Sequence, residues 1–384
     1  MRWNIQERLF GPWEKAHVLW LHGASLGECK VLLALAKRIL EDFKNCPPIL
    51  LTSQKTEVVD FINKKIRSDF SKHSIQTKIA PLPLNVIIKR FYKQVNPLCL
   101  ILCENELWPA YLSAEKSRIN GSKLILVSGR FKRGAYLPKQ ILSPKAFAAA
   151  DFQTELDQKR FSKKCPLLNS TVSGNWKLLS KKTKKSIHEK KYEVAFLSIH
   201  YSELAFLKNL FLNLYAENKA FIVAPRRLEE TEKFSKFFAK IKIKESRFPN
   251  FSSNGVCLID SFGQFEKFLP LSKTAVIGGS FKARPGIHDF YEPLLFGIPT
   301  YIGPFSYGQE EMVSRYFQAG ILQKLPLRPC SLPNYFASSE EIIKFLEKEI
   351  YAVEQGYLKL RQQLSNWIVK NEKIRLKVVS DILE

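Results

Sequence analysis

Three glutamates stand shortly after apolar runs of this sequence, where a carboxylate could take part in proton transfer. Glu28 follows the run at residues 18–22, and Glu104 and Glu106 follow the run at residues 98–103. Both runs have the composition of strands buried in a parallel sheet. Ligands bind beyond the carboxyl ends of such strands, and a carboxylate there is costly unless it binds something. Glu104 and Glu106 therefore indicate a binding site, whereas Glu28 alone is explained more simply as a carboxylate at a helix start.

The stretch at residues 274–304 contains a second candidate site, which combines a strand, a glycine loop, a helix and another strand. Residues 275–277 are apolar, and the Gly-Gly-Ser sequence behind them permits a tight turn and the close approach of a ligand. Glu292 opens a predicted short helix that ends at Gly297. The free N–H groups of its first turn would favour a phosphate, and Glu292 could accept hydrogen bonds from sugar hydroxyls. The alternative is a packing unit that binds no ligand.

Composition narrows the class of protein. A chain of 384 residues can form two or more domains, and 45% hydrophobic with 12% aromatic residues argues against disorder. Sixty basic and 36 acidic residues give a net charge of +24, which attracts nucleic acid, anionic lipid or phosphorylated glycolipid. The sequence contains no RNP, zinc-knuckle or helix-turn-helix signature, so we do not expect a nucleic-acid partner. Seven cysteines without a CxxC pair fit a reducing cytoplasm.

Membrane contact is expected without a spanning helix, because no apolar run approaches about 18 residues. The segment at residues 85–95 mixes basic with large apolar side chains. Such a helix either rests at a lipid interface or packs its apolar side on a sheet. No Asp-x-Asp sequence and no histidine cluster with ligand spacing occurs, so we expect no metal and no other cofactor.

Apolar runs and helical periodicities alternate along the chain, which predicts an α/β fold. We place an N-terminal domain at residues 1–177, a lysine-rich solvated linker at 178–191 and a C-terminal domain at 192–384. Helices are predicted over residues 31–40, 85–95 and 342–350, and again from Tyr357 onward. Strands are predicted at residues 18–22, 49–52, 98–103, 124–128, 194–199, 220–224, 275–277 and 299–302.

The motifs, taken in order, resemble those of the 3-deoxy-D-manno-octulosonic acid (Kdo) transferases, a family of GT-B glycosyltransferases. The first strand runs into a His-x-x-Ser-x-Gly-Glu turn, and residues 104–109 resemble the family's Glu-Thr-Glu-Leu-Trp-Pro. Residues 174–177 read Gly-Asn-Trp-Lys, as in the family's Gly-Asn-x-Lys step. Gly-Gly-Ser, then His and Glu-Pro ahead of Phe-Gly-Ile-Pro, resembles the donor half of the family. The resemblance covers most of the chain, from His22 to about Gln309.

This resemblance implies a GT-B fold with two Rossmann-like domains, whose C-terminal helix packs back on the N-terminal domain. It implies an inverting transfer of Kdo from CMP-Kdo to a hydroxyl of the lipid A precursor, lipid IVA. It also implies a peripheral position on the cytoplasmic face of the bacterial inner membrane. The family usually carries a hydrophobic N-terminal anchor, and this sequence starts just after the point where that anchor would end. A GT-B enzyme for another nucleotide sugar and a basic nucleic-acid-binding protein are the alternatives.

The resemblance also assigns roles to residues, with Glu28 as the catalytic base. The chain departs from the family pattern at Arg227, where the family has histidine, and at Ile287, Asp289 and Gly308 in the donor pocket. These departures put details of sugar recognition in doubt. The expected acceptor-binding residues are Ser25, Gly27, Glu104, Glu106 and Arg130, and the expected donor-binding residues are Lys177, His200, Pro225, Arg226, Gly278, Gly279, Ser280, His288 and Glu292.

Overall fold

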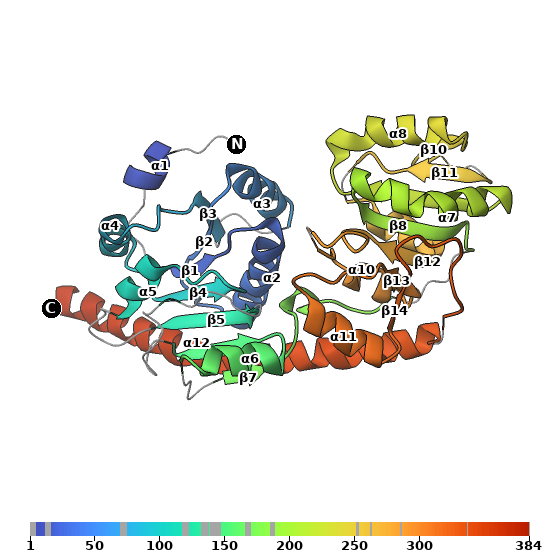
Figure 1. The fold of residues 1–384 in the computed structure, drawn as a ribbon. Helices are drawn as coiled ribbons and strands as arrows, with labels where there is room; N and C mark the ends of the chain where they lie inside the picture. Colours follow the sequence, from blue (N-terminus) through green and yellow to red (C-terminus); the bar gives the residue numbers. More distant parts are fainter. Residues whose placement is uncertain are drawn as a thin grey trace. The chain divides into compact units, whose positions relative to one another are not determined.

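The chain forms two compact units, each with its own parallel sheet (Figure 1). Unit 1 comprises Met1–Lys181 together with Glu349–Glu384, and unit 2 comprises Lys182–Lys348. The predicted α/β fold class is therefore confirmed. The computed structural model describes residues 5–11, 17–69, 75–116, 123–131, 138, 147–165, 170–184, 189–250, 253–261, 263–284, 286–335 and 337–383.

Seven strands form the sheet of unit 1, namely β1 (Leu19–His22), β2 (Ile49–Ser53), β3 (Ile75–Ile79), β4 (Cys99–Cys103), β5 (Leu124–Gly129), β6 (Ala149–Phe152) and β7 (Ser170–Val172). All pairings are parallel, and the order in space is β3-β2-β1-β4-β5-β6-β7. β1 lies between β2 and β4, so that Leu19 pairs with Ile49 on one side and with Cys99 on the other. The order of the strands reverses between β1 and β4, and ligands of open α/β sheets bind at such a switch point.

Helices cover both faces of this sheet (Figure 1). The face that carries Trp20 packs against α4 (Asn85–Val95) and α5 (Pro109–Lys116), and α2 (Leu26–Asp42) and α3 (Thr56–Asp69) contact the strands from the other face. The Trp20 ring lies 4.5 Å from the Phe91 ring and 5.1 Å from the Tyr111 ring, measured between centroids. These buried aromatic contacts hold the end of β1 rigidly. Other described helices of unit 1 are α1 (Ile5–Phe10), α6 (Glu155–Ser162) and the 3-10 helix η2 (Trp176–Leu178).

Seven parallel strands also form the sheet of unit 2, namely β8 (Tyr192–Ile199), β9 (Ala220–Pro225), β10 (Glu245–Arg247), β11 (Gly255–Leu258), β12 (Ser272–Ile277), β13 (Thr300–Ile302) and β14 (Leu322–Lys324). Their order is β10-β11-β9-β8-β12-β13-β14, so the switch point lies between β8 and β12. A cluster of aromatic rings fills one side of this sheet, where the Phe211 and Phe221 rings stack at 5.4 Å.

The helices of unit 2 include α7 (Leu204–Ala216), α8 (Thr231–Lys240), α10 (Tyr291–Leu294) and α11 (Glu310–Gln318), with the single turns η3 (Tyr201–Glu203), η4 (Leu228–Glu230), α9 (Phe265–Phe268) and η5 (Leu269–Leu271). The helix predicted over residues 292–297 is therefore only one turn long, and it begins one residue earlier. Its last predicted residues instead form a turn, with Gly297 at a φ of +64°. That left-handed conformation ends a helix readily when the residue is glycine.

The lysine-rich segment before β8 is less free than a solvated linker, since its described residues hold contacts. The Ser180 N–H donates to the Glu354 carboxylate at 3.0 Å, and the Lys184 N–H donates to the Leu295 carbonyl at 2.7 Å. The Lys184 ammonium also lies 2.8 Å from the Glu266 carboxylate. Leu178 and Leu179 at the start of the predicted linker are also buried, so lysine content alone missed this anchoring.

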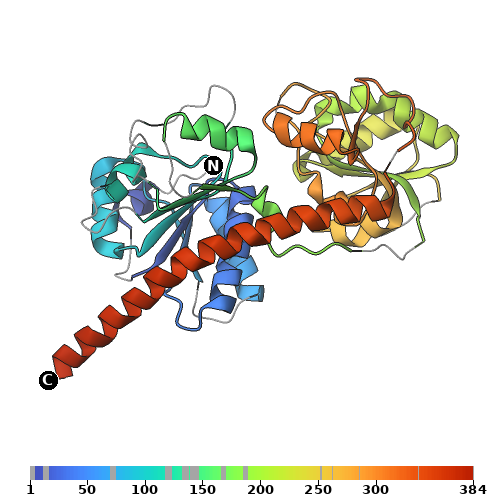
Figure 2. The ribbon, with the colours of Figure 1, turned by 90° about the horizontal axis from the view of Figure 1, so that it is seen from below.

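The C-terminal segment is one continuous helix, α12 (Ser339–Leu383), rather than two separate helices (Figure 2). The part from Glu349 belongs to unit 1. There the Tyr357 hydroxyl donates to Asp42 at 2.7 Å, and the Arg38 guanidinium lies 3.1 Å from the Glu354 carboxylate. Gly356 lets the helix backbone approach β7, because a Cβ at this position would lie 2.4 Å from the Ser173 hydroxyl.

We expect Gly356→Ala to destabilise unit 1 by about 1–3 kcal/mol because the added methyl overpacks this contact. Helix propensity alone predicts the opposite sign, since alanine in a helix is favoured over glycine by about 1 kcal/mol. Denaturant titration followed by tryptophan fluorescence measures the effect, because all six tryptophans belong to unit 1. Gly27→Ala in α2 is the matched control, since its Cβ would have no neighbour closer than 3.8 Å. A stabilised Gly356→Ala protein would contradict the close approach.

Candidate active site

The turn after β1 holds Glu28 in a capping box at the start of α2. Ser25 is the N-cap residue, and its hydroxyl accepts from the Glu28 N–H at 3.2 Å and donates to the Glu28 carboxylate at 2.8 Å. The carboxylate also accepts from the Ala24 N–H at 2.7 Å. These contacts match the helix-start interpretation of Glu28. They also fix the carboxylate at the carboxyl end of β1, which a catalytic base at this edge would require.

Two further carboxylates follow β4, which is the neighbour of β1 across the switch point. Glu104 has a left-handed backbone, with φ of +55°, and its carboxylate lies 2.7 Å from the Arg130 guanidinium. Glu106 accepts a hydrogen bond from the Trp108 indole N–H at 2.7 Å. The structure thus brings Glu28, Glu104, Glu106 and Arg130 to one edge of unit 1, as the sequence predicts.

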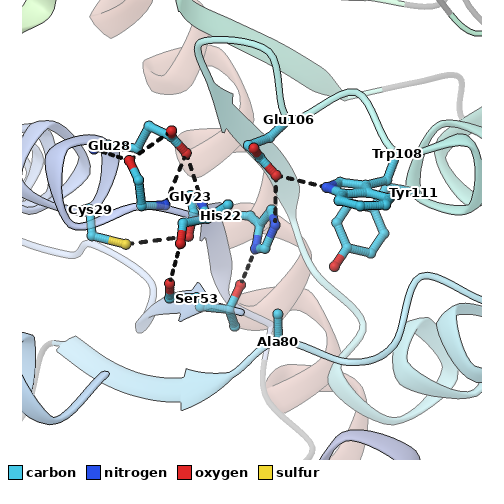
Figure 3. A network of polar contacts seen from close by, with 12 residues as sticks. His22, Gly23, Glu28, Cys29, Ser53, Ala80, Glu106, Trp108 and Tyr111 are labelled. Atoms are coloured by element: carbon cyan, nitrogen blue, oxygen red, sulfur yellow. Dashed lines mark hydrogen bonds and ion pairs between the residues drawn. The ribbon is translucent and has the colours of Figure 1, made fainter. Parts of the chain in front are cut away.

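His22 is a fully buried residue of this network that we did not predict as a site residue (Figure 3). Its Nδ1 lies 2.9 Å from the Thr52 hydroxyl, and its Nε2 faces the Glu106 carboxylate at 3.7 Å. At that distance the contact is an electrostatic one, and the direct hydrogen bond to Glu106 comes from Trp108. A histidine at the end of an otherwise apolar strand was the signal in the sequence that could have identified it.

The carboxylates of this edge differ in their electrostatic surroundings. Burial raises the pKa of Glu28 to about 7, and the charges of Glu104 and Glu106 add to the rise, against the hydrogen bonds from Ser25 and Ala24. Burial also acts to raise the pKa of Glu106, but the neighbouring His22 ring and the hydrogen bond from Trp108 outweigh it, so that this pKa is lowered. Neighbouring carboxylates with separated pKa values are typical of acid–base sites.

Lys177 lies in unit 1, beside the turn that contains Glu28. Its Cε would be 3.9 Å from a Cβ added to Gly27. The Asn175 side chain accepts from the Lys177 N–H at 3.0 Å and so begins η2. The structure therefore groups Lys177 with the residues expected to bind the acceptor, whereas the other expected donor-binding residues belong to unit 2.

In unit 2 the ends of β8, β9 and β12 bring further predicted residues to one edge. His200 follows β8, and its Nε2 lies 2.6 Å from Nε2 of His288. Pro225 is the buried last residue of β9, and Arg226 after it has an exposed side chain and donates its N–H to the Ile199 carbonyl at 2.8 Å. Burial lowers the pKa of His200, with Arg226 acting in the same direction and Glu203 opposing it.

The Gly-Gly-Ser loop after β12 is shaped by the chain itself. A Cβ at Gly278 would lie 2.3 Å from the carbonyl of Ser198, and one at Gly279 would lie 2.1 Å from the carbonyl of Gly286. Gly279 also has a φ of +76°, which favours glycine. The buried Ser280 hydroxyl donates to the Ile277 carbonyl at 2.5 Å and accepts from the Gly303 N–H at 2.7 Å. The close approach that we predicted for a ligand is therefore made by neighbouring backbone.

Glu292 is half-buried in α10, a single turn that follows His288. Among the described residues, no three His, Cys, Asp or Glu side chains gather closely enough to hold a metal ion. None of the described helices combines the length with the apolar character that crossing a membrane requires.

The sequence of this chain is similar to those of known transferases. Residues 3–179 match the family described as 3-deoxy-D-manno-octulosonic-acid transferase (kdotransferase). The 3-deoxy-D-manno-octulosonic acid transferase of Aquifex aeolicus (strain VF5) is 31% identical over 316 residues, which cover 80% of this chain and 82% of that protein. The protein of the same name from Chlamydophila psittaci is 23% identical over 79% of this chain and 73% of its own length.

Solved structures are similar to this chain over most of its length. A glycosyltransferase from Rickettsia africae has a TM-score of 0.53 at 10% identity and covers 93% of this chain and 99% of its own. MurG from Acinetobacter baumannii also has a TM-score of 0.53 at 10% identity, with coverage of 91% and 99%. A UDP-N-acetylglucosamine 2-epimerase is similar to the same degree, at 0.53 and 13% identity over 89% of this chain and 91% of its own. The fold is GT-B, and this fold alone does not distinguish the activities.

The raised pKa of Glu28 predicts a pH-dependent effect on stability. The folded state holds the proton up to about pH 7, against an ordinary value of 4.5, so the stabilisation from protonation is complete at low pH and is lost as pH rises through 7. Relative to Glu28→Gln, the wild-type unit 1 should therefore lose unfolding free energy from about pH 5 to about pH 8. Tryptophan-monitored denaturation measures this difference.

Glu341→Gln is the matched control for this measurement, because Glu341 forms a second capping box with Ser338 at the start of α12. Hydrogen bonds from Ser338 lower the pKa of that exposed carboxylate, so its effect on stability develops below its ordinary pKa. Unit 2 contains no tryptophan, so the control is followed by far-ultraviolet circular dichroism, and between about pH 5 and pH 8 the Glu341→Gln difference should stay flat. An equally flat curve for Glu28→Gln would exclude the raised pKa.

Proposed function

This chain belongs to the 3-deoxy-D-manno-octulosonic acid transferase family, and from that premise we propose that it transfers Kdo from CMP-Kdo to a hydroxyl of the lipid A precursor, with inversion at the anomeric carbon. The observation that carries this proposal is the position of Glu28. Its carboxylate is fixed at the switch point of unit 1, and burial brings its pKa to about 7. A general base works best when its pKa is close to the working pH.

The proposed reaction needs a group that takes the proton of the acceptor hydroxyl as that oxygen attacks the sugar. Glu28 fills this role when ionised, and the Ser25 hydroxyl and Ala24 N–H orient its carboxylate. Glu106 stays charged because its pKa is lowered, and its charge helps to raise the pKa of Glu28. The ion pair between Glu104 and Arg130 lies at the same edge of the sheet, and we place contacts to the acceptor there.

Unit 2 binds the nucleotide donor in this proposal. The leaving group is a cytidine monophosphate, so groups that stabilise a phosphate should lie at the switch point of that unit. The exposed Arg226 guanidinium is suited to this, because it is permanently charged and can donate two hydrogen bonds to phosphate. We place His200, His288 and Glu292 beside the nucleotide and the sugar. Lys177 belongs to unit 1, beside the turn that contains Glu28.

The direct test incubates the protein with CMP-Kdo and a tetraacylated lipid A precursor, with products identified by mass spectrometry. We expect Kdo-bearing lipid from the wild type and a turnover lower by about 10²–10⁴-fold for Glu28→Gln, because the amide cannot accept the proton. The wild-type rate should rise with pH through about 7, as Glu28 ionises.

Glu341→Gln is again the control, since it removes an exposed capping carboxylate at the start of α12 that has no role in the proposed reaction. A folded Glu28→Gln protein with near-normal turnover would remove the base from Glu28. A wild type that uses a different nucleotide sugar, and not CMP-Kdo, would overturn the proposed donor.

We also propose that α4 contacts the anionic surface of the inner membrane from its cytoplasmic side. Its inner face is buried, whereas Val86 is 81% exposed and the preceding Leu84 is 56% exposed. Lys89, Arg90 and Lys93 are exposed on the same helix. Apolar side chains flanked by basic ones are typical of helices that rest at a lipid interface.

Cosedimentation with vesicles tests this contact. Binding to anionic vesicles should weaken as salt rises, since each basic residue near such a surface contributes on the order of 1 kcal/mol that salt screens. Lys89→Glu with Arg90→Glu should weaken it further. Two charge reversals on unit 2, at the exposed Lys208 and Lys240, keep the same net charge and should bind like the wild type. Equal binding to neutral and anionic vesicles would contradict an electrostatic attraction to the membrane.

A further inference from the structure

Unit 2 contains a buried carboxylate, Glu203, to which no role has been assigned so far. Its side chain is 1% exposed, and it forms no ion pair with any described residue. It accepts instead from three backbone N–H groups. His200 N and Gly279 N donate to Oε2, and Phe281 N donates to Oε1, each at 2.9 Å. Burial of an ionised carboxylate costs several kcal/mol unless hydrogen bonds of this kind compensate it.

The three donors belong to two separate segments that meet at the switch point of the sheet. His200 begins the turn after β8, whereas Gly279 and Phe281 belong to the loop after β12, the neighbouring strand. Glu203 therefore ties the two loops together at the edge where a ligand of this unit would bind. Oε2 accepts from Gly279 and Oε1 accepts from Phe281, so the two hydrogen bonds restrain the glycine loop on both sides of Ser280.

The same carboxylate determines where two histidines lie. The His200 backbone is held by Glu203 directly, and the His288 N–H donates to the carbonyl of Gly278, at 3.2 Å, beside the tied glycine. The two imidazoles meet with their Nε2 atoms 2.6 Å apart. Two ring nitrogens at this distance share one proton as a hydrogen bond, so their backbones must be placed accurately.

We propose that Glu203 is a positioning residue of the donor site. It holds the glycine loop and the His200–His288 pair in their binding geometry before a nucleotide arrives. Because it is buried, it acts through these groups and does not touch the ligand. This inference rests on the proposed function, in which unit 2 binds the donor. Preorganisation of this kind increases affinity because the loops do not have to be ordered on binding.

Glu203→Gln tests the proposal with a minimal change. The amide keeps one acceptor oxygen but replaces the other by an NH₂ group, which cannot accept from a backbone N–H. Calorimetry with CMP should show Kd raised roughly 10- to 100-fold, as expected when one or two charge-assisted hydrogen bonds of the loop are lost. The ¹⁵N signals of the two imidazoles should lose the signature of a shared proton.

Leu214→Ala is the matched control, because it removes a buried side chain of the same unit near the far end of α7. It should lower the melting temperature of unit 2 at least as much as Glu203→Gln does, and leave the Kd for CMP within about twofold of wild type. A merely structural Glu203 would instead give no larger change in CMP affinity than Leu214→Ala at equal loss of stability. That outcome would overturn the inference.

Two measurements keep the test decisive if Glu203→Gln does not fold. Glu203→Asp keeps the charge but withdraws the carboxylate by one methylene, so it should also weaken CMP binding. Hydrogen exchange on the wild type needs no variant, and the Gly279 and Phe281 amides should exchange slowly without CMP. If they exchange freely until CMP is added, the loop is ordered by the ligand and the inference is wrong. A wild type that does not bind CMP would refute the proposed donor site and the inference with it, whereas equal CMP binding by wild type and folded Glu203→Gln would refute the inference alone.

Discussion

A carboxylate that leaves water must be compensated by hydrogen bonds, and both units meet this constraint in the same place. Beyond the strand that begins each unit's sheet, a glutamate folds back so that its carboxylate accepts from the backbone N–H three residues earlier, Glu28 from Ser25 after β1 and Glu203 from His200 after β8. The local device is the same, but its surroundings differ. Glu203 is fully buried and satisfied by three N–H groups, whereas Glu28 is only partly buried and faces other carboxylates. The first arrangement holds loops, and the second leaves a group whose proton can be exchanged.

Parallel topology explains why these glutamates stand where a ligand would bind. In each sheet the first strand lies inside the sheet, with a strand on either side, and the strand order reverses beside it. The loops after the two central strands therefore diverge and leave the strand ends accessible. In unit 1 this edge gathers Glu28, Glu104 and Glu106, and in unit 2 it gathers His200 and the glycine loop. The aromatic cores below both edges keep the strand ends rigid, as Trp20 does beneath His22.

Electrostatic coupling within unit 1 gives its carboxylates different protonation. Burial acts on both Glu28 and Glu106 in the same direction, so burial alone would raise both pKa values. The difference arises because Glu106 has the Trp108 N–H and the His22 ring beside it, while Glu28 has two neighbouring negative charges. Thr52 in turn holds His22 in place, because its hydroxyl lies 2.9 Å from His22 Nδ1.

The sequence by itself determined the alternation of elements, the buried strands and the edge at which the chemistry lies, because hydrophobic periodicity is a local property. The helix predicted over residues 85–95 is α4, residue for residue. The short strands β7, β10 and β14 were not predicted, since three residues carry too little periodicity and, unlike β13, none of them stands in a recognised motif. Only the tertiary structure decided that His22 faces Glu106. It also decided that position 278 requires glycine, because the Ser198 carbonyl occupies the place of a side chain. It alone also decided that Glu203 joins two loops about 76 residues apart. Each of these depends on contacts between strands that are neighbours in the sheet but not in the chain, and a single sequence contains no record of that proximity.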